Sequence, residues 1–232
     1  MLKDVKHIFF DLDKTLWDFN TNSTLALKEL YQKHELATKG IPSIEEMIDI
    51  YSKINQKLWA EYAKNIISKE TLRTQRFNET FEYFGVYNYQ LAFQFGLDYI
   101  EISPRKNILY PHTIETLNYL KDKYHLHIIT NGFEEVQFIK LKSSGILHFF
   151  KEIITSEKAG AKKPDKAIFE FALNEANATP EYSIMIGDDL DVDIKGALNS
   201  NIRAIHFNPI MADKISGDFL SINSLVKLTE LL

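Results

Sequence analysis

Two aspartates, Asp11 and Asp13, follow directly after an apolar stretch near the start of the chain. That stretch, residues 5–10, is too short for a helix and rich in β-branched and aromatic residues, which predicts a buried strand. A carboxylate at the carboxyl end of a buried strand lies where open α/β sheets bind ligands. It is partly dehydrated there, which suits it to chemistry and makes it costly without a counter-charge. For these two residues alone, an ordinary role in a turn is an equal alternative.

A second motif combines a hydroxyl with a turn. Thr130 ends the apolar stretch 125–130 and is followed by Asn131 and Gly132, after which a helix is expected to begin. A side-chain donor, backbone N–H groups and the N-terminus of a helix together suit a phosphate oxygen. Alone the signal is weak, because Asn-Gly is common in turns.

A lysine in a flexible loop forms the third motif. Lys163 precedes Pro164, and Pro164 is expected in the first turn of the next helix. A lysine held at this point can neutralise both a carboxylate and a phosphate. A solvated loop charge is the default alternative for any single lysine.

The fourth motif is a cluster of aspartates behind the apolar stretch 183–187. Its members are Asp188, Asp189, Asp191 and Asp193. Such an oxygen-rich setting is what a hard cation such as Mg²⁺ prefers. A calcium-binding loop is excluded, because Ile194 stands where glycine is needed and Ser200 where a bidentate glutamate is needed. Part of the cluster is expected to serve a helix N-terminus, and Asp191 is the candidate for a cap without chemistry.

The elements that must position these motifs alternate along the second half of the chain. The pattern predicts strands at 125–130, 152–155, 183–187 and 202–206, and helices at 113–123, 133–144, 165–176, 191–199 and 224–232. This alternation predicts an α/β core, a Rossmann-like doubly wound parallel sheet with helices on both faces. Residues 17–105 carry only helical patterns. We therefore expect a core domain of residues 1–16 and 106–232 with an inserted helical cap domain.

Composition narrows the class of protein. The chain has 232 residues and a net charge of −5, which gives no electrostatic footprint for a nucleic acid polymer. No apolar run approaches the roughly 20 residues of a membrane span. The N-terminus leads straight into the first predicted strand, which leaves no room for a signal peptide, and cysteine is absent. A cytoplasmic protein is expected, and its oligomeric state, monomer or weak dimer, stays open.

Taken in order, the motifs resemble the four motifs of the haloacid dehalogenase superfamily. The matching stretches are Asp11-x-Asp13-x-Thr15, Thr130-Asn131-Gly132, Lys163-Pro164 and Gly187-Asp188-x-x-x-x-Asp193. The resemblance spans essentially the whole chain, and the place of the insertion is similar to that in the subclass with a helical cap. Within the cap, residues 55–62, Leu72 and Arg76-Phe77 look most like the YjjG-type pyrimidine 5′-nucleotidases.

The resemblance implies a Mg²⁺-dependent phosphatase that works through an aspartyl-phosphate intermediate. Asp11 would be the nucleophile, and Asp13 the general acid and then the general base. The carboxylates of Asp11 and Asp188 and the backbone carbonyl of Asp13 would bind the Mg²⁺ ion. Dehalogenases of the superfamily lack the second aspartate, so Asp13 indicates phosphoryl chemistry.

The remaining motif residues take supporting roles in this resemblance. Thr130 and the amide of Asn131 would bind the phosphate, and Lys163 would stabilise charge on both the phosphate and the nucleophile. Asp193 would fix a metal-bound water or Lys163, and Asp189 is the rival for that role.

The substrate is expected to be a small phosphorylated metabolite, most of all a nucleoside 5′-monophosphate. A sugar-phosphate phosphatase, a phosphomutase and a non-enzymatic binding module are the alternatives. The candidates for substrate contact are Trp17, Trp59, Tyr62 and Arg76. For the three aromatic residues a place in the cap core is favoured over stacking on a base, and a surface charge is the alternative for Arg76.

Three residues stand where this family commonly has glycine, namely Asn65, His112 and Asn201. Asparagine tolerates a positive φ better than most residues, so Asn65 and Asn201 are expected to leave the fold intact. His112 lies at the return from the cap and leaves the four motifs untouched.

Overall fold

The computed structural model describes residues 4–210, 214–216 and 219–232. The chain forms two compact units, one of residues 1–19 and 107–232 and the other of residues 20–106. We call the first the core unit and the second the cap unit. The insertion expected at 17–105 thus compares with a unit at 20–106.

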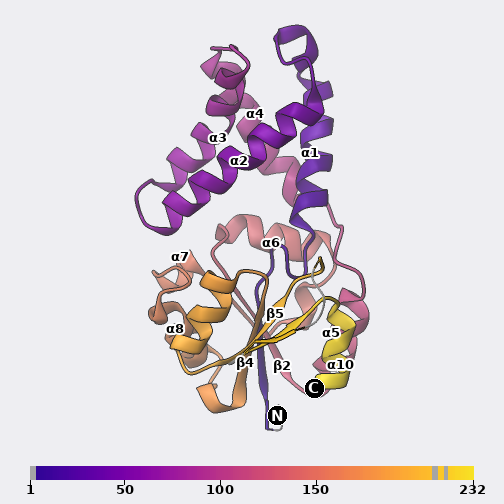
Figure 1. The fold of residues 1–232 in the computed structure, drawn as a ribbon, viewed down its shortest axis with the longest axis vertical. Coiled ribbons are helices and arrows are strands. Elements are labelled where there is room, and N and C mark those ends of the chain that lie inside the picture. Colours follow the sequence, from indigo (N-terminus) through magenta and orange to yellow (C-terminus); the bar gives the residue numbers. More distant parts are fainter. Residues whose placement is uncertain (1–3, 211–213, 217–218) are drawn as a thin grey trace. The chain divides into compact units, whose positions relative to one another are not determined.

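A seven-stranded sheet forms the centre of the core unit, in the order β3-β2-β1-β4-β5-β7-β6 (Figure 1). Its strands are β1 (His7–Phe10), β2 (His125–Thr130), β3 (Glu152–Thr155), β4 (Ser183–Gly187), β5 (Arg203–Phe207), β6 (Lys214–Ser216) and β7 (Phe219–Ile222). Paired strands run parallel, except that β6 is antiparallel to β7. The predicted strands are confirmed, and β6 and β7 are additions that the sequence pattern does not reveal.

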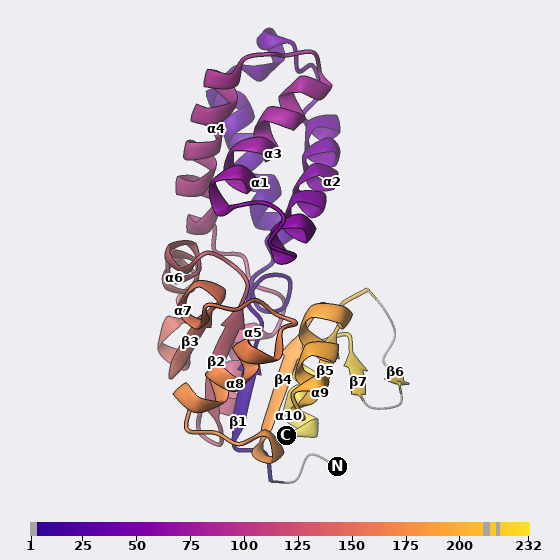
Figure 2. The same ribbon diagram turned by 90° about the vertical axis from the view of Figure 1, so that its left-hand side faces the viewer.

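Helices lie on both faces of this sheet (Figure 2). They are α5 (Thr113–Lys121), α6 (Glu134–Ser143), α7 (Ser156–Ala159), α8 (Lys166–Glu175), α9 (Gly196–Asn199) and α10 (Leu228–Leu231). Strand β1 is buried on both sides, with Ile8 and Phe10 packed in the cluster that includes α5 and α10, and Phe9 in the cluster that includes α8. Burial on both faces explains why Ile8, Phe9 and Phe10 are all apolar. The predicted doubly wound α/β fold is confirmed.

Some helix boundaries differ from the prediction. The helix expected at 191–199 is a π-helical turn, Leu190–Lys195, that runs into α9. The helix expected at 224–232 is a 3-10 turn, Leu225–Lys227, followed by α10. Further 3-10 turns lie at Leu36–Lys39, Ser103–Arg105, Leu147–Phe149 and Pro180–Tyr182.

The cap unit is helical. Its helices are α1 (Phe19–Lys33), α2 (Ile44–Ala63), α3 (Lys69–Tyr83) and α4 (Tyr89–Ile102). Ser43 is the N-cap of α2, since its hydroxyl accepts a hydrogen bond from the Glu46 amide at 3.2 Å. A buried cluster fills the centre of the unit, with Phe77, Phe81 and Phe95 fully buried. The cap unit therefore has an apolar core of its own.

Positive φ angles occur where the glycine-like positions predict them. Asn65 has φ 57°, His112 66° and Asn201 58°. Asparagine and histidine both populate this region more readily than most other residues with a side chain.

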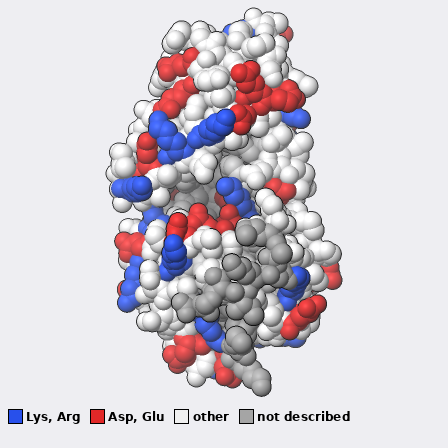
Figure 3. All heavy atoms as spheres, viewed as in Figure 1, with Lys and Arg blue, Asp and Glu red and all other residues white. Residues whose placement is uncertain are grey.

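Two further observations concern the hydropathy of the helices and the charge of the surface. No helix among the described residues is long and apolar enough to cross a membrane. On the face shown in Figure 3, acidic and basic side chains are interspersed on both units.

Candidate active site

The carboxyl ends of β1 and β4 bring two predicted aspartates together. The strands pair in parallel with Phe10 opposite Ile186, and the Asp11 amide donates to the Ile186 carbonyl at 2.9 Å. Asp11 follows the last residue of β1 and Asp188 follows the last residue of β4, so both lie at the same edge of the sheet. This is the edge at which open α/β sheets place their ligand sites.

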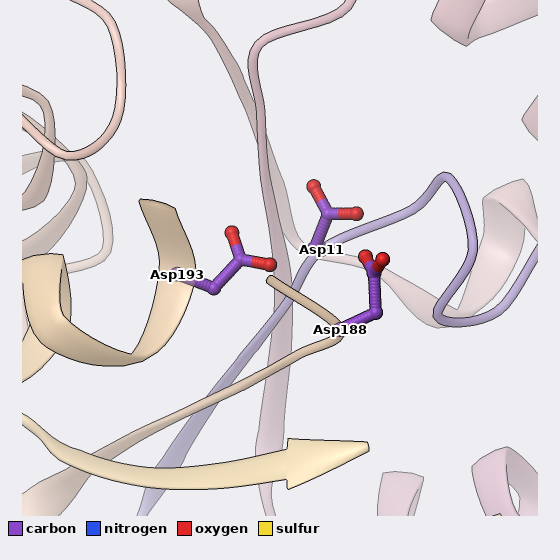
Figure 4. Close-up of side chains that lie close together, drawn as sticks. All are labelled: Asp11, Asp188 and Asp193. Atoms are coloured by element: carbon purple, nitrogen blue, oxygen red, sulfur yellow. The ribbon is translucent and has the colours of Figure 1, made fainter. Parts of the chain in front are cut away.

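Asp193 joins them from the π-helical turn after β4. One carboxylate oxygen from each of Asp11, Asp188 and Asp193 lies within 4.8 Å of the others (Figure 4). Gly187 makes room for this arrangement, because a Cβ atom there would lie 2.3 Å from an oxygen of Asp193. We call these three residues the carboxylate cluster.

Lys163 is buried and contacts two members of the carboxylate cluster. Its side chain is 1% exposed, and its Nζ lies 2.6 Å from Asp11 Oδ1, 2.6 Å from Asp193 Oδ1 and 2.8 Å from the Ile129 carbonyl. These three acceptors use all three N–H groups of the ammonium. Lys163 is thus a buried bridge between two carboxylates, and a bond to phosphate would require it to release one of them.

The loop that carries Lys163 is fixed by Asn131. The Asn131 side chain accepts a hydrogen bond from the Lys163 amide at 2.8 Å and donates one to the Lys163 carbonyl at 2.9 Å. Its backbone amide is the group predicted to bind phosphate. The expected position of Pro164 is wrong, because Asp165 is the N-cap of α8 and the helix begins at Lys166, so Pro164 precedes it.

The electrostatics of the site follow from burial. Burial raises the pKa of Asp11 well above its ordinary value, against the opposing effect of Lys163. Burial and the neighbouring Asp193 raise the pKa of Asp188 to about 7. Burial alone would lower the pKa of Lys163, but Asp11 and Asp193 outweigh it and raise that pKa.

Three carboxylates and one ammonium, when ionised, leave a charge of −2. A divalent cation would balance that charge, and carboxylate oxygens are the ligands that Mg²⁺ prefers. The residues present therefore fit a Mg²⁺ ion, with Asp11 and Asp188 as its predicted side-chain ligands.

Asp13 has different partners. Lys140 Nζ lies 2.6 Å from its Oδ1 and 2.8 Å from its Oδ2, and Gln137 Nε2 donates to Oδ2 at 3.2 Å. Neither Lys140 nor Gln137 belongs to the four sequence motifs. Their spacing of three residues on a predicted helix places them on one face, but a single lysine on a helix normally indicates a solvated surface.

Thr130 is buried at the end of β2. Its hydroxyl accepts a hydrogen bond from the Gly132 amide at 3.0 Å and lies 3.4 Å from Gln137 Oε1. The predicted turn after the strand is therefore closed by the threonine side chain itself.

The remaining aspartates of the fourth motif separate into two roles. Asp193 contacts Lys163, whereas Asp189 is exposed and its Oδ1 caps the π-helical turn by accepting from the amides of Asp191 and Val192 at 2.9 Å. The prediction of Asp191 as the cap is wrong, since Asp189 has that role. Of the two candidates for contact with Lys163, Asp193 makes it, and Asp189 makes no hydrogen bond to Lys163 among the described residues.

Of the candidates for substrate contact, Trp17 is a core residue. It is fully buried and packs with the apolar cluster that includes β1. Trp59 and Tyr62 lie on α2 with their rings edge to face at 5.6 Å. Arg76 is buried, with its guanidinium 4.9 Å from the centre of the Tyr99 ring, so the alternative of a surface charge is wrong.

Fold and site together define an α/β protein with three clustered carboxylates at one edge of a largely parallel sheet. The chain belongs to the haloacid dehalogenase-like hydrolases, whose family model matches residues 5–201.

Curated relatives of two kinds are similar over most of their length. The pyrimidine 5′-nucleotidase PynA of Streptococcus pneumoniae is 30% identical over 88% of this chain and 84% of its own. A glyceraldehyde 3-phosphate phosphatase of Methanothermobacter thermautotrophicus is 32% identical over 88% and 86%. The crystal structure of the putative hydrolase YfnB from Bacillus subtilis bound to magnesium superposes with a TM-score of 0.89, at 28% identity over 99% of both chains.

Proposed function

We propose that this protein is a Mg²⁺-dependent phosphatase that hydrolyses small phosphomonoesters in the cytoplasm, and that nucleoside 5′-monophosphates are its preferred substrates. One observation carries the proposal: Lys163 forms a buried bridge between Asp11 and Asp193, next to Asp188. A carboxylate fixed in this way, within a group that fits a divalent cation, is suited to attack phosphorus.

In the first step, Asp11 attacks phosphorus and an aspartyl-phosphate bond forms while the ester P–O bond breaks. The leaving alkoxide takes a proton from Asp13. In the second step, Asp13 accepts a proton from water, the resulting hydroxide attacks phosphorus, and Asp11 is regenerated as phosphate leaves. Protons and charges balance over the two steps.

The attack brings two anions together, so the repulsion between the Asp11 carboxylate and the phosphate must be offset. A carboxylate and a phosphate 4 Å apart repel by about 4 kcal/mol at an effective dielectric constant of 20. Lys163 opposes this by holding positive charge against Asp11 in a buried position. A Mg²⁺ ion held by Asp11, the Asp13 carbonyl and Asp188 would supply the remaining positive charge.

The preference for nucleotides rests on similarity to PynA and on the cap residues 55–62, Leu72 and Arg76-Phe77. Similarity to a glyceraldehyde 3-phosphate phosphatase supports a second candidate, a sugar-phosphate phosphatase with the same mechanism.

Phosphate release from a panel of esters tests the proposal. The panel contains pyrimidine and purine 5′-monophosphates, glyceraldehyde 3-phosphate and hexose phosphates, each with Mg²⁺ and with a chelator. We expect kcat/KM for a pyrimidine nucleotide to exceed that of every sugar phosphate by at least about tenfold. The chelator is expected to remove the activity.

The other possible results of the panel distinguish the alternative functions. Preference for glyceraldehyde 3-phosphate would keep the mechanism and replace the substrate. A stable phosphoenzyme without phosphate release would indicate a phosphomutase, and absence of turnover across the panel would contradict the phosphatase.

A further inference from the structure

Helix α6 directs a buried lysine at the proposed general acid. The Lys140 side chain is 6% exposed, and its ammonium contacts both oxygens of Asp13 at 2.6 and 2.8 Å. The Asp13 side chain is 27% exposed, so the aspartate faces solvent more than its partner does. The lysine is therefore the fixed member of this pair.

Aromatic rings hold the ammonium in place. Lys140 Nζ lies 4.4 Å from the centre of the Trp17 ring and 5.7 Å from that of Phe19. Aromatic faces attract a cation, and a desolvated ammonium is stable only if its N–H groups and charge are matched. Trp17 is fully buried, so this wall cannot move aside without disturbing the core.

Gln137 adds a third restraint one helical turn earlier. Its amide donates to Asp13 Oδ2 at 3.2 Å, and its carbonyl lies 3.4 Å from the Thr130 hydroxyl. Gly132 leaves the space for this side chain, because a Cβ atom there would lie 2.1 Å from Gln137 Nε2. The phosphate-binding turn and the proposed general acid are thus linked through α6.

We propose that Lys140 is the positioning residue for Asp13 and holds its carboxyl group where it meets the leaving group. The proposal rests on the proposed phosphatase function and adds to it a residue outside the four motifs. A general acid must lie within about 2.6–3.2 Å of the oxygen it protonates. Two short contacts from one ammonium fix both the place and the rotation of the carboxyl group, which an aspartate on a surface turn would otherwise not keep.

The test compares leaving groups. A nucleoside 5′-monophosphate releases an alkoxide that needs a proton, whereas p-nitrophenyl phosphate releases a phenolate that leaves without one. Because kcat/KM reports the steps up to release of the leaving group, it isolates the acid step from hydrolysis of the phosphoenzyme. We expect Lys140→Met to lower kcat/KM about 100-fold for the nucleotide, the scale of general acid catalysis, and less than about threefold for p-nitrophenyl phosphate.

Matched variants separate positioning from folding. Lys142→Met changes an exposed lysine on the same helix and is expected to leave both esters unaffected. Lys140→Arg is expected to restore part of the nucleotide activity, because it keeps a cation opposite Asp13. Lys140→Gln serves as the second test should the Met variant not fold by circular dichroism.

The outcomes distinguish this proposal from the proposed function. Equal losses on both esters, or no loss on the nucleotide, would overturn the positioning role while wild-type turnover still supports the phosphatase. A wild-type protein inactive on both esters with Mg²⁺ would overturn the phosphatase itself and this role with it.

Discussion

Asp11 owes its place to two constraints that act on a single side chain. Its backbone is tied to β4 through the Ile186 carbonyl, and its carboxylate is tied to Lys163 at 2.6 Å. Burial raises the pKa of this carboxyl, and the lysine works in the opposite direction. The ion pair with Lys163 therefore favours the ionised, nucleophilic form of Asp11, and burial opposes it.

Replacement of this one carboxylate is the most direct test of covalent catalysis. Asp11→Asn keeps the size of the side chain and an oxygen that can accept from Lys163, so the fold should persist. The nucleophile is lost, and we expect kcat with the best nucleotide to fall by at least about 1000-fold. Asp191→Asn, which changes an exposed aspartate paired with Lys195, is the control and should keep full activity. Turnover by Asp11→Asn near the wild-type rate would exclude the aspartyl-phosphate mechanism.

Residues at strand ends could be predicted, and residues on helix faces could not. Asp11 and Asp188 follow strands whose central residues are apolar, and parallel pairing then places both aspartates at one edge of the sheet. Lys140 and Gln137 lie on α6, where a lysine gives no sign of burial until Trp17 and Asp13 are placed against it. Long-range packing of this kind is absent from the sequence pattern.

At the level of elements, the opposite end of the sheet carries a buried histidine pair. His7 on β1 and His127 on β2 are hydrogen-bonded at 3.1 Å between Nδ1 and Nε2, and they are 8% and 1% exposed. His127 Nδ1 is buried and has no hydrogen-bond partner among the described residues, so a proton there would be unsatisfied. His127 therefore carries its proton on Nε2, directed at His7 Nδ1.

This pair makes stability depend on pH. Burial, with His7 and His125 nearby, lowers the pKa of His127 to about 3 from an ordinary value of 6.5. Below pH 6.5 the unfolded chain takes up a proton that the folded state refuses until about pH 3, so stability is present above 6.5 and lost as the pH falls. The loss from this residue is roughly 2 kcal/mol at pH 5.

We expect His127→Gln to lessen the fall in unfolding free energy between pH 7 and pH 5, measured by urea denaturation. Glutamine is neutral throughout this range and can still donate to His7. His148→Gln, at an exposed position, is the control and should leave the pH dependence unchanged. An identical pH dependence in wild type and His127→Gln would show that the pair does not titrate as described.

Boundaries of elements were predictable where sequence and packing agree. The strands of the parallel sheet match because burial on both faces makes most of their central residues apolar. The helix expected at 191–199 differs, because Asp189 caps a π-helical turn that lets Asp193 reach Lys163. Local helix signals cannot reveal such a turn, since the ion pair that rewards it joins residues 30 positions apart.

For the molecule as a whole, grouping negative charges at the site lowers the stability of the folded state. One carboxylate oxygen from each of Asp11, Asp188 and Asp193 lies within 4.8 Å of the others, and Lys163 bridges Asp11 and Asp193. The raised pKa of Asp188, about 7, expresses this cost. The folded state holds that proton more tightly than the unfolded chain does, so the stability it contributes is present at low pH and is lost as the pH rises through 7.

Mg²⁺ should reverse this loss. A ligand that binds only the folded state adds about 2.7 kcal/mol at 100 times its Kd. Because Mg²⁺ must displace the Asp188 proton below pH 7, we expect the rise in unfolding temperature on adding Mg²⁺ to be larger at pH 8 than at pH 6. Differential scanning fluorimetry with and without a chelator measures it. Asp188→Asn should be more stable than wild type in chelator and should gain little from Mg²⁺, and an equal gain in both proteins would place the ion elsewhere.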